Sequence, residues 1–343
     1  MKIIDCYKIT VFFILLNAVL LQKLKAQDPQ FTQFYAAPLY LNPALSGSTK
    51  LTKAAFLYRN QWPSIPANFV TYSASIDQSL PRFSSGVGLS VVKDQLGEAF
   101  STTTVTANYS FYFNLTKKVE VRMGTGIGYG IRRIDLSKIT FETGASSTES
   151  ITSPNNSYID ISGGLELHNS VYSLGFSAFH LNKPTNSFLN SNEVLPIRFN
   201  LHAGARLPLK LKVLRPLYRL LYSVVKKELF INPKLLLKKQ GAFTQLDLGL
   251  DVHYGIFMFG IWNRGLPLGT SSRVNGFSRE SIALLAGYSQ HGLTAAYSYD
   301  FTISQQSIST GGAHELSLVY LFDLKIDRKK PLRRHQIIPC PQF

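Results

Sequence analysis

From Leu51 onward the chain consists of runs of roughly ten residues in which apolar and polar residues alternate. Alternation with a period of two indicates a β-strand, because successive side chains of a strand point to opposite faces of the sheet. Each run therefore has one apolar face and one face of polar or small residues, and the fold they predict is all-β. Residues 244–254 set Leu246, Leu248, Leu250, Val252 and Tyr254 against Gln245, Asp247, Gly249, Asp251 and His253.

Fourteen such runs can be counted, and several of the connections between them are clearly long or clearly short. These long connections all fall at one end of the strands, and these short ones all fall at the other. The long connections are 135–156, 182–196, 264–278 and 303–311, and the short ones are 114–118, 168–170, 254–255 and 289–292. The predicted strands are 48–60, 67–78, 84–93, 99–114, 118–132, 157–167, 171–181, 197–209, 228–238, 244–254, 256–263, 279–289, 292–302 and 312–323.

An even strand number with long loops on one side and short turns on the other is typical of bacterial outer-membrane barrels. A soluble β-sandwich alternates in the same way but has no reason to sort its loops by side. The sequence therefore predicts a transmembrane antiparallel β-barrel with apolar faces toward lipid. Its candidate polar lumen residues are Asp247, Asp251, His253 and Asp300. Its candidate interfacial aromatic girdles are Tyr58, Trp62, Phe111, Phe113, Tyr254, Trp262, Tyr320 and Phe322.

The first 26 residues are predicted to be a secretory signal peptide. Lys2 and Lys8 lie beside an apolar run from Ile9 to Leu21, and the small residue Ala26 precedes a predicted cut before Gln27. A membrane anchor is the alternative, but the run is shorter than the roughly 20 residues that span a bilayer. Loss of four lysines and one aspartate with this segment lowers the net charge from +16 to +13. We expect a protein exported to the outer membrane.

Basic residues gather in two places on the predicted periplasmic side. Residues 213–227 follow helical spacing with basic residues mostly opposite the apolar ones, which indicates an amphipathic helix that lies on the inner membrane face or docks a partner. Two strands extended beyond the membrane are an equal alternative. The tail 324–343 is the second basic stretch, and it is either solvated or a docking site. Cys340, the last of the two cysteines, is expected to be a free thiol.

The opening of the predicted mature chain, QDPQFTQFYAAPLYLNPALSG (27–47), resembles the N-terminal signature of the PorP/SprF family, outer-membrane proteins of type IX secretion and gliding in Bacteroidetes. The similar segments occur in order along nearly the whole mature chain, whereas 213–227 is less typical of the family. Further similar segments are YRNQW (58–62), SASID (73–77), FSAFHLNKP (176–184), LLAGY (284–288), YSYDFTIS (297–304), GAHELSLVYLF (312–322) and CPQF (340–343).

This resemblance implies a fourteen-stranded barrel related in architecture to the fatty-acid channel FadL. It also implies a non-enzymatic role, in which the protein anchors surface proteins that carry a type IX C-terminal signal or helps to export them. Some members instead link the translocon to periplasmic components. The expected partners are outer-membrane lipid, the C-terminal domain of a secreted cargo or adhesin, and periplasmic type IX components. A channel for small molecules, argued from the barrel itself, is the alternative function.

Residues 27–47 have no regular period. Their aromatic side chains need burial while their prolines prevent a regular ladder. We predict that this segment starts on the periplasmic side and folds into the barrel mouth as a plug, with Phe34 near Gly126 and with Asn42-Pro43 turning the chain into the first strand. A periplasmic handle for another subunit is the alternative. The candidate plug or partner residues are Phe31, Phe34, Tyr35, Pro38, Asn42 and Pro43.

No motif for catalysis, cofactor or metal binding is found. The glycines of GTGIGYG (124–130) recur with period two, so in a strand they share one face and do not form a dinucleotide loop. A face of glycines instead lets a plug approach the wall closely. His180, His253, His291, His314 and His335 lack metal-ligand spacing. The clustered positive charge suits anionic headgroups or acidic partners rather than nucleic acid.

Overall fold

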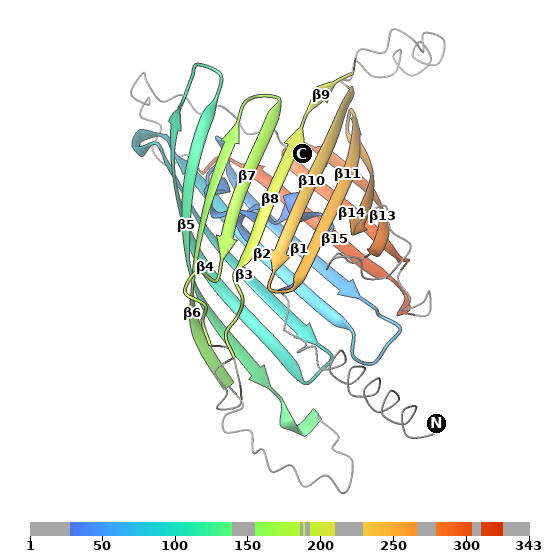
Figure 1. Cartoon of the computed structure of the whole chain (residues 1–343). Coiled ribbons are helices and arrows are strands. Elements are labelled where there is room, and N and C mark those ends of the chain that lie inside the picture. The colour runs from blue at the N-terminus through green and yellow to red at the C-terminus, as the bar shows by residue number, and fades with distance from the viewer. Residues whose placement is uncertain are drawn as a thin grey trace, which may run out of the picture.

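The computed structural model is a closed antiparallel β-barrel of fourteen spanning strands, which confirms the predicted fold class (Figure 1). The structure describes residues 28–138, 155–185, 188, 193–209, 229–265, 279–303 and 310–324. The strands are β1 (Thr52–Gln61), β2 (Phe69–Leu80), β3 (Ser85–Leu96), β4 (Phe100–Asn114), β5 (Glu120–Ile134), β6 (Asn155–His168), β7 (Tyr172–Phe179), β8 (Arg198–Ala205), β9 (Leu207–Pro208), β10 (Leu229–Gln240), β11 (Phe243–Tyr254), β12 (Phe257–Gly265), β13 (Arg279–Gln290), β14 (Leu293–Thr302) and β15 (Ala313–Phe322).

Two pairings close the sheet into a barrel. The first strand pairs with the last, from Thr52↔Phe322 to Gln61↔Ala313. The pairing of β10 with β11 joins the two remaining edges. β8 and β9 are one spanning strand in an unchanged register with β10, interrupted only at Arg206. Closure leaves no open sheet edge, which a lipid environment requires because it offers no water to unpaired backbone groups.

The burial of side chains alternates along the strands as the sequence predicts. On β12, Phe257, Phe259 and Ile261 are 49%, 57% and 53% exposed, whereas Met258 and Trp262 are each 1% exposed. The large exposed side chains are aliphatic and aromatic, and the buried partners on the opposite face are mostly polar or small. The barrel therefore has an apolar exterior and a polar interior, which is the inverse of a soluble protein.

The loops are distributed between the two ends of the barrel as expected, with one refinement. The barrel end at the top of Figure 1 carries the short turns after β4, β6, β11 and β13. The first residue of β1 and the last residue of β15 lie at this same end. This end is periplasmic by the rule for such barrels. The opposite end carries the long connections, but it also carries two tight turns, at 97–99 and 241–242. The four long connections that the sequence predicts thus lie at the outer end, and tight turns occur at both ends. One further long connection, residues 209–228 between β9 and β10, joins strands at the periplasmic end.

Several predicted features lie outside the described residues. These are the signal peptide 1–26, the amphipathic stretch 213–227, nearly all of the basic tail 324–343, and Cys340.

The described residues also contain short helices. Three 3-10 helices and a four-residue α-helix precede or connect the strands: η1 (Phe34–Ala36), α2 (Pro38–Leu41), η2 (Pro43–Leu45) and η3 (Pro81–Phe83), with η4 (Leu136–Lys138) after β5. Within the described ranges, no helix has the length and hydropathy of a transmembrane helix.

The outward face of β12 offers a test of the lipid-facing assignment. Ile261→Arg places a charge at mid-strand on this face, and we expect the free energy of unfolding to fall by about 2–4 kcal/mol. Phe257→Arg lies on the same face at the first residue of the strand, and we expect a loss of about 0–1 kcal/mol because the interface hydrates the charge. Denaturant unfolding of the protein folded into lipid vesicles measures both. Equal losses for the two variants would contradict the assignment.

Candidate functional site: the lumen of the barrel

The segment before the first strand lies inside the barrel. Residues 28–51, here called the lumen segment, contain η1, α2 and η2 and appear in dark blue within the barrel in Figure 1. Pro38 and Pro43 each occupy the first turn of a helix, where a missing N–H costs nothing. Phe31, Leu39 and Asn42 are at most 2% exposed. The prolines thus shape the segment into short helical turns, and the barrel wall buries its side chains.

The lumen segment runs from the outer half of the barrel to its periplasmic end. Asp28 contacts His180, just past the outer end of β7, and Arg198, at the outer end of β8. The carbonyl groups of Ser46 and Gly47 accept hydrogen bonds from Arg122, near the periplasmic end of β5. The prediction that the segment starts on the periplasmic side is therefore wrong. The lumen segment begins near the outer end and runs toward the periplasmic end to β1, because the partners of Asp28 lie at outer strand ends.

A buried ionic cluster holds the part of the lumen segment that lies nearer the outer end of the barrel. The Arg59 guanidinium forms ion pairs of 2.8 Å with both Asp300 and Glu315. The Glu315 carboxylate accepts hydrogen bonds from the backbone N–H groups of Thr32 (2.9 Å) and Gln33 (2.6 Å). A second guanidinium, from Arg264, lies 2.8 Å from Asp300. Buried charges are tolerated only when paired and hydrogen-bonded, and here the segment backbone completes the pairing.

The start of the lumen segment makes a second ionic contact. The Asp28 carboxylate lies 2.7 Å from His180 Nε2 and 2.7 Å from a nitrogen of Arg198, while His180 Nδ1 lies 2.9 Å from Asp160. Burial opposes the charged forms of both groups. Nevertheless, His180 and Arg198 hold the pKa of Asp28 well below its usual value. The two carboxylates raise the pKa of His180 to about 9. This contact is therefore an ion pair at neutral pH.

An aromatic cluster holds the middle of the lumen segment. The ring of Phe34 contacts Trp262 edge-on at 5.2 Å between centroids, and Tyr35 stacks on the same indole at 6.2 Å. Lys234 Nζ lies 3.5 Å from the centre of the Tyr35 ring and pairs with Asp251, which also accepts a hydrogen bond from Trp262 Nε1. The amine is thus held between a π face and a carboxylate, two partners that each attract a cation.

This aromatic cluster corrects two expectations. Trp262 is not part of an interfacial girdle, because it faces the lumen and is 1% exposed. Phe34 packs on β12 rather than near Gly126 of β5, whose close neighbours are Ser162 and Asn108. The Trp262 ring also covers Gly249 of β11, where a Cβ would lie 2.3 Å from the ring. The alternation assigned Gly249 and Trp262 to faces but gave no information about what stands opposite them.

Polar side chains of the barrel wall bind the backbone of the lumen segment in its periplasmic part. Arg122 donates to the carbonyl groups of Ala44 (3.1 Å), Ser46 (2.8 Å) and Gly47 (3.0 Å), and pairs with Glu120 at 2.8 Å. On the neighbouring wall, Ser177 and Asn200 both donate to the carbonyl group of Leu41. Asn42 donates to the carbonyl group of Leu165 and accepts from the N–H of Ala44. Backbone groups that cannot join a sheet therefore find side-chain partners.

Three glycines of the wall lie directly under the lumen segment. A Cβ at Gly124 would lie 2.2 Å from the Ala44 nitrogen, and one at Gly86 would lie 2.1 Å from the Ser46 oxygen. A Cβ at Gly164 would lie 2.0 Å from Asn42 Oδ1. Only glycine allows the two backbones to approach so closely. The prediction that a glycine face lets a plug approach the wall fits the surroundings of Gly124.

The structure places the predicted lumen residues on the inner face, but not in one site. Asp247, Asp251 and Asp300 are at most 2% exposed, and His253 is partly buried. Asp251 belongs to the aromatic cluster and Asp300 to the ionic one, whereas Asp247 accepts from Gln245. Within the described ranges, no group of three His, Cys, Asp or Glu side chains is arranged to hold a metal ion.

The sequence reasoning missed the cations that organise the lumen. Arg59, Arg122, Arg198 and Arg264 all lie on inward faces and are at most 5% exposed. Alternation carries a signal for Arg59, Arg122 and Arg198, because each occupies a polar-face position of its predicted strand, whereas Arg264 falls in the predicted connection 264–278. When the lumen of a barrel is filled, a charged residue on the polar face of a strand is buried. Such a residue needs a partner of opposite charge or a hydrogen-bond partner inside the barrel.

One protein family and several solved structures are similar to this chain. The family described as "Type IX secretion system membrane protein PorP/SprF" matches residues 23–320. Among solved structures, Omp33 of Acinetobacter baumannii is 7% identical, with a TM-score of 0.39 over 81% of this chain and 100% of that one. A FadL homologue of Pseudomonas aeruginosa is 13% identical, with a TM-score of 0.38 over 82% and 93%. No curated protein sequence gives a significant match.

Strand closure, an apolar exterior and a polar interior define an outer-membrane β-barrel whose lumen contains its own N-terminal segment. The match to the family model extends over most of the sequence. The chain belongs to the PorP/SprF family of type IX secretion system membrane proteins.

Two adjacent glycines of β6 test how the lumen segment is seated. Gly164→Ala forces a Cβ against Asn42, and we expect it to lower the free energy of unfolding by about 1–3 kcal/mol. Gly163→Ala is the matched control, because its Cβ makes only ordinary contacts, with Leu181 Cδ1 at 3.7 Å and the Gly124 oxygen at 3.9 Å, so we expect a change within about 0.5 kcal/mol. Denaturant unfolding measures both. The same loss for each variant would mean that strand propensity, and not the segment, sets the effect.

The Asp28–His180 contact predicts a dependence on pH. The pKa of His180 rises from 6.5 to about 9 in the folded protein, so its stabilisation is complete below about pH 6.5 and is lost as the pH rises through about 9. We expect the amide hydrogens of residues 28–33 to exchange faster between pH 8 and 10, beyond the intrinsic increase, as measured by mass spectrometry.

His180→Asn should remove this pH-dependent step. His291→Asn is its control, since His291 is exposed in the turn after β13 and both histidines have a positive φ that asparagine accepts. A step of the same size in the His180→Asn protein would show that another group controls the segment.

Proposed function

We propose that this protein is a non-enzymatic outer-membrane component of type IX secretion that anchors surface proteins with type IX C-terminal signals, or assists their export, through its outer loops and rim. Membership of the PorP/SprF family supports the secretion role. The predicted signal peptide 1–26 supports export to the outer membrane. The partners we propose are outer-membrane lipid, the C-terminal domain of a cargo or adhesin, and periplasmic type IX components.

The contents of the lumen favour this role over solute transport. The lumen segment is bound to opposite walls: Thr32 and Gln33 to Asp300 and Glu315 on β14 and β15, and Leu41 to β7 and β8. A solute that crossed the barrel would have to displace buried ion pairs and hydrogen bonds. Removing one partner of such a pair leaves an uncompensated charge, which typically costs about 3–5 kcal/mol. Phe31, Phe34, Tyr35, Pro38, Asn42 and Pro43 act in this proposal as the residues that shape and seat a plug.

A channel for small molecules remains the second candidate, because the barrel itself supplies a lumen wide enough to hold a folded segment. In that role the lumen segment would have to leave or rearrange during transport. Polar residues such as Asp247 and His253 would then contact the passing solute.

Deletion of the gene in the source bacterium distinguishes the two roles. We expect proteins with type IX C-terminal signals to be lost from the cell surface and found in the medium or the periplasm. We expect no change in the uptake of small solutes. Surface proteomics and uptake assays measure the two outcomes, and complementation with the wild-type gene should restore surface retention. Normal surface retention together with reduced uptake would favour the channel and contradict the proposal.

A further inference from the structure

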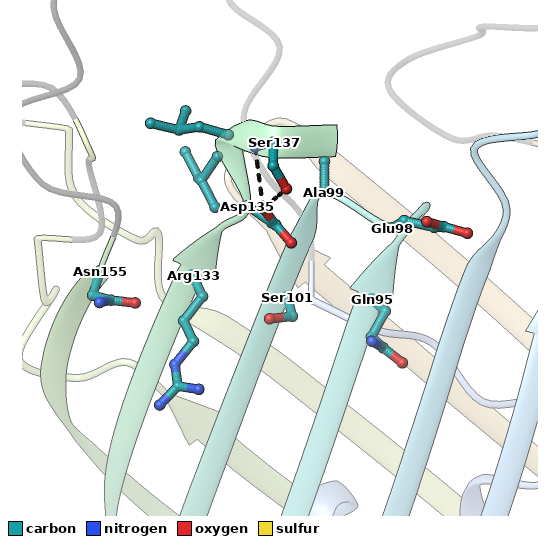
Figure 2. Close-up of a pocket in the computed structure, with 10 residues that line it drawn as sticks. Gln95, Glu98, Ala99, Ser101, Arg133, Asp135, Ser137 and Asn155 are labelled. Carbon is teal, nitrogen blue, oxygen red and sulfur yellow. Dashed lines mark hydrogen bonds between the residues drawn. The ribbon is translucent and has the colours of Figure 1, made fainter. Parts of the chain in front are cut away.

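A polar pocket of about 520 Å³ lies at the outer end of β3 to β6, away from the lumen (Figure 2). Four of its residues form one row across four neighbouring strands, because Gln95 pairs with Ser101, Ser101 with Arg133, and Arg133 with Asn155. The β3–β4 turn, with Glu98 and Ala99, and the stretch Asp135–Ser137 form its upper border. Its volume is in the range of pockets that hold small ligands.

This pocket faces the lipid side of the barrel wall. A second row lies on the same outward face, four residues closer to the periplasmic end along each strand. It consists of Val91, Val105, Tyr129 and Ile159, which pair across the strands in that order. These four side chains are 36–57% exposed and belong to the apolar exterior. Lys93 and Thr103 lie in the row between. The outward face thus changes from apolar to polar at the pocket, as expected where acyl chains give way to headgroups.

Among the residues that the structure describes, one cation that lines the pocket, Arg133, has no acidic partner. Glu98 pairs with Lys138 at 2.9 Å, and the Asp135 carboxylate accepts from the backbone and the hydroxyl of Ser137. Arg133 makes no ion pair or hydrogen bond with any residue that the structure describes. Figure 2 shows its side chain extending along the strand, away from the Asp135–Ser137 border, so that its guanidinium lies below the level of Ser101. Lys93 is exposed on the same face, one row below Gln95.

Arg133, flanked by uncharged donors, suits one class of ligand. A guanidinium binds phosphate through two parallel hydrogen bonds, and the Ser101 hydroxyl and Gln95 amide can bind the hydroxyl groups of a sugar. Lys93 can extend along the wall toward the same phosphate. We propose that this pocket binds the phosphorylated sugar headgroup of an outer-leaflet glycolipid, whose acyl chains lie on the apolar row of Val91, Val105, Tyr129 and Ile159. A lipid rather than a free anion is the occupant, because the pocket opens above lipid-facing side chains.

Native mass spectrometry of the purified full-length barrel in detergent tests this proposal, with bisphosphorylated lipid A as the probe. We expect Arg133→Ala to weaken lipid A binding about tenfold or more, since a hydrogen bond to a charged group contributes at this level. Lys239→Ala is the matched control, because Lys239 is an exposed cation at the outer end of β10, in another sector of the barrel, and it should bind lipid A as the wild type does. Heat-modifiable migration on gels verifies that each variant is folded.

Two further probes identify the source of the phosphate. A glycolipid with the same acyl chains and no phosphate should bind the wild type at least tenfold more weakly than lipid A. Inorganic phosphate at millimolar concentration should not displace lipid A. The proposal is overturned if Arg133→Ala retains wild-type affinity, if the glycolipid without phosphate binds equally well, or if inorganic phosphate alone competes.

Discussion

The structure depends on the pairing of an irregular backbone with inward-facing side chains. The lumen segment contains prolines and short helical turns, so much of its backbone cannot join a sheet. In a closed barrel its carbonyl and N–H groups must find partners among wall side chains, because leaving them unpaired costs several kcal/mol each. Arg122, Asn200 and Glu315 supply those partners. The buried charges of the wall, in turn, would be incompletely satisfied without the segment.

The sequence predicted the barrel because alternation reports which face each side chain occupies. It predicted the strand number and the inward positions of Asp251 and Asp300, since both follow from a period of two. It could not predict that Trp262 leaves the expected girdle to bind Phe34 and Tyr35, because an aromatic residue near a strand end suits either face. The sequence also could not predict the direction in which the lumen segment runs through the barrel. It depends on contacts such as Asp28 with His180, which are 152 residues apart in the chain.

The proposed function rests on the division of the barrel into two surfaces. Inside, four arginines and the lumen segment form a set of ion pairs and hydrogen bonds that a solute would have to displace to enter the barrel. Outside, an apolar wall meets a polar row at the outer end, and the long loops extend from the same end. A family member built in this way presents its outer rim, rather than its lumen, to other molecules. That arrangement agrees with a role in holding or delivering surface proteins, with lipid as a second ligand of the rim.

The ion conductance of the purified mature protein in planar lipid bilayers tests the central claim most directly. If the lumen segment is seated as described, the intact protein gives no steady conductance, and a variant that lacks residues 28–47 gives a stable, ohmic one. A steady conductance from the intact protein, equal to that of the shortened variant, would show that the segment does not close the barrel and would contradict the account.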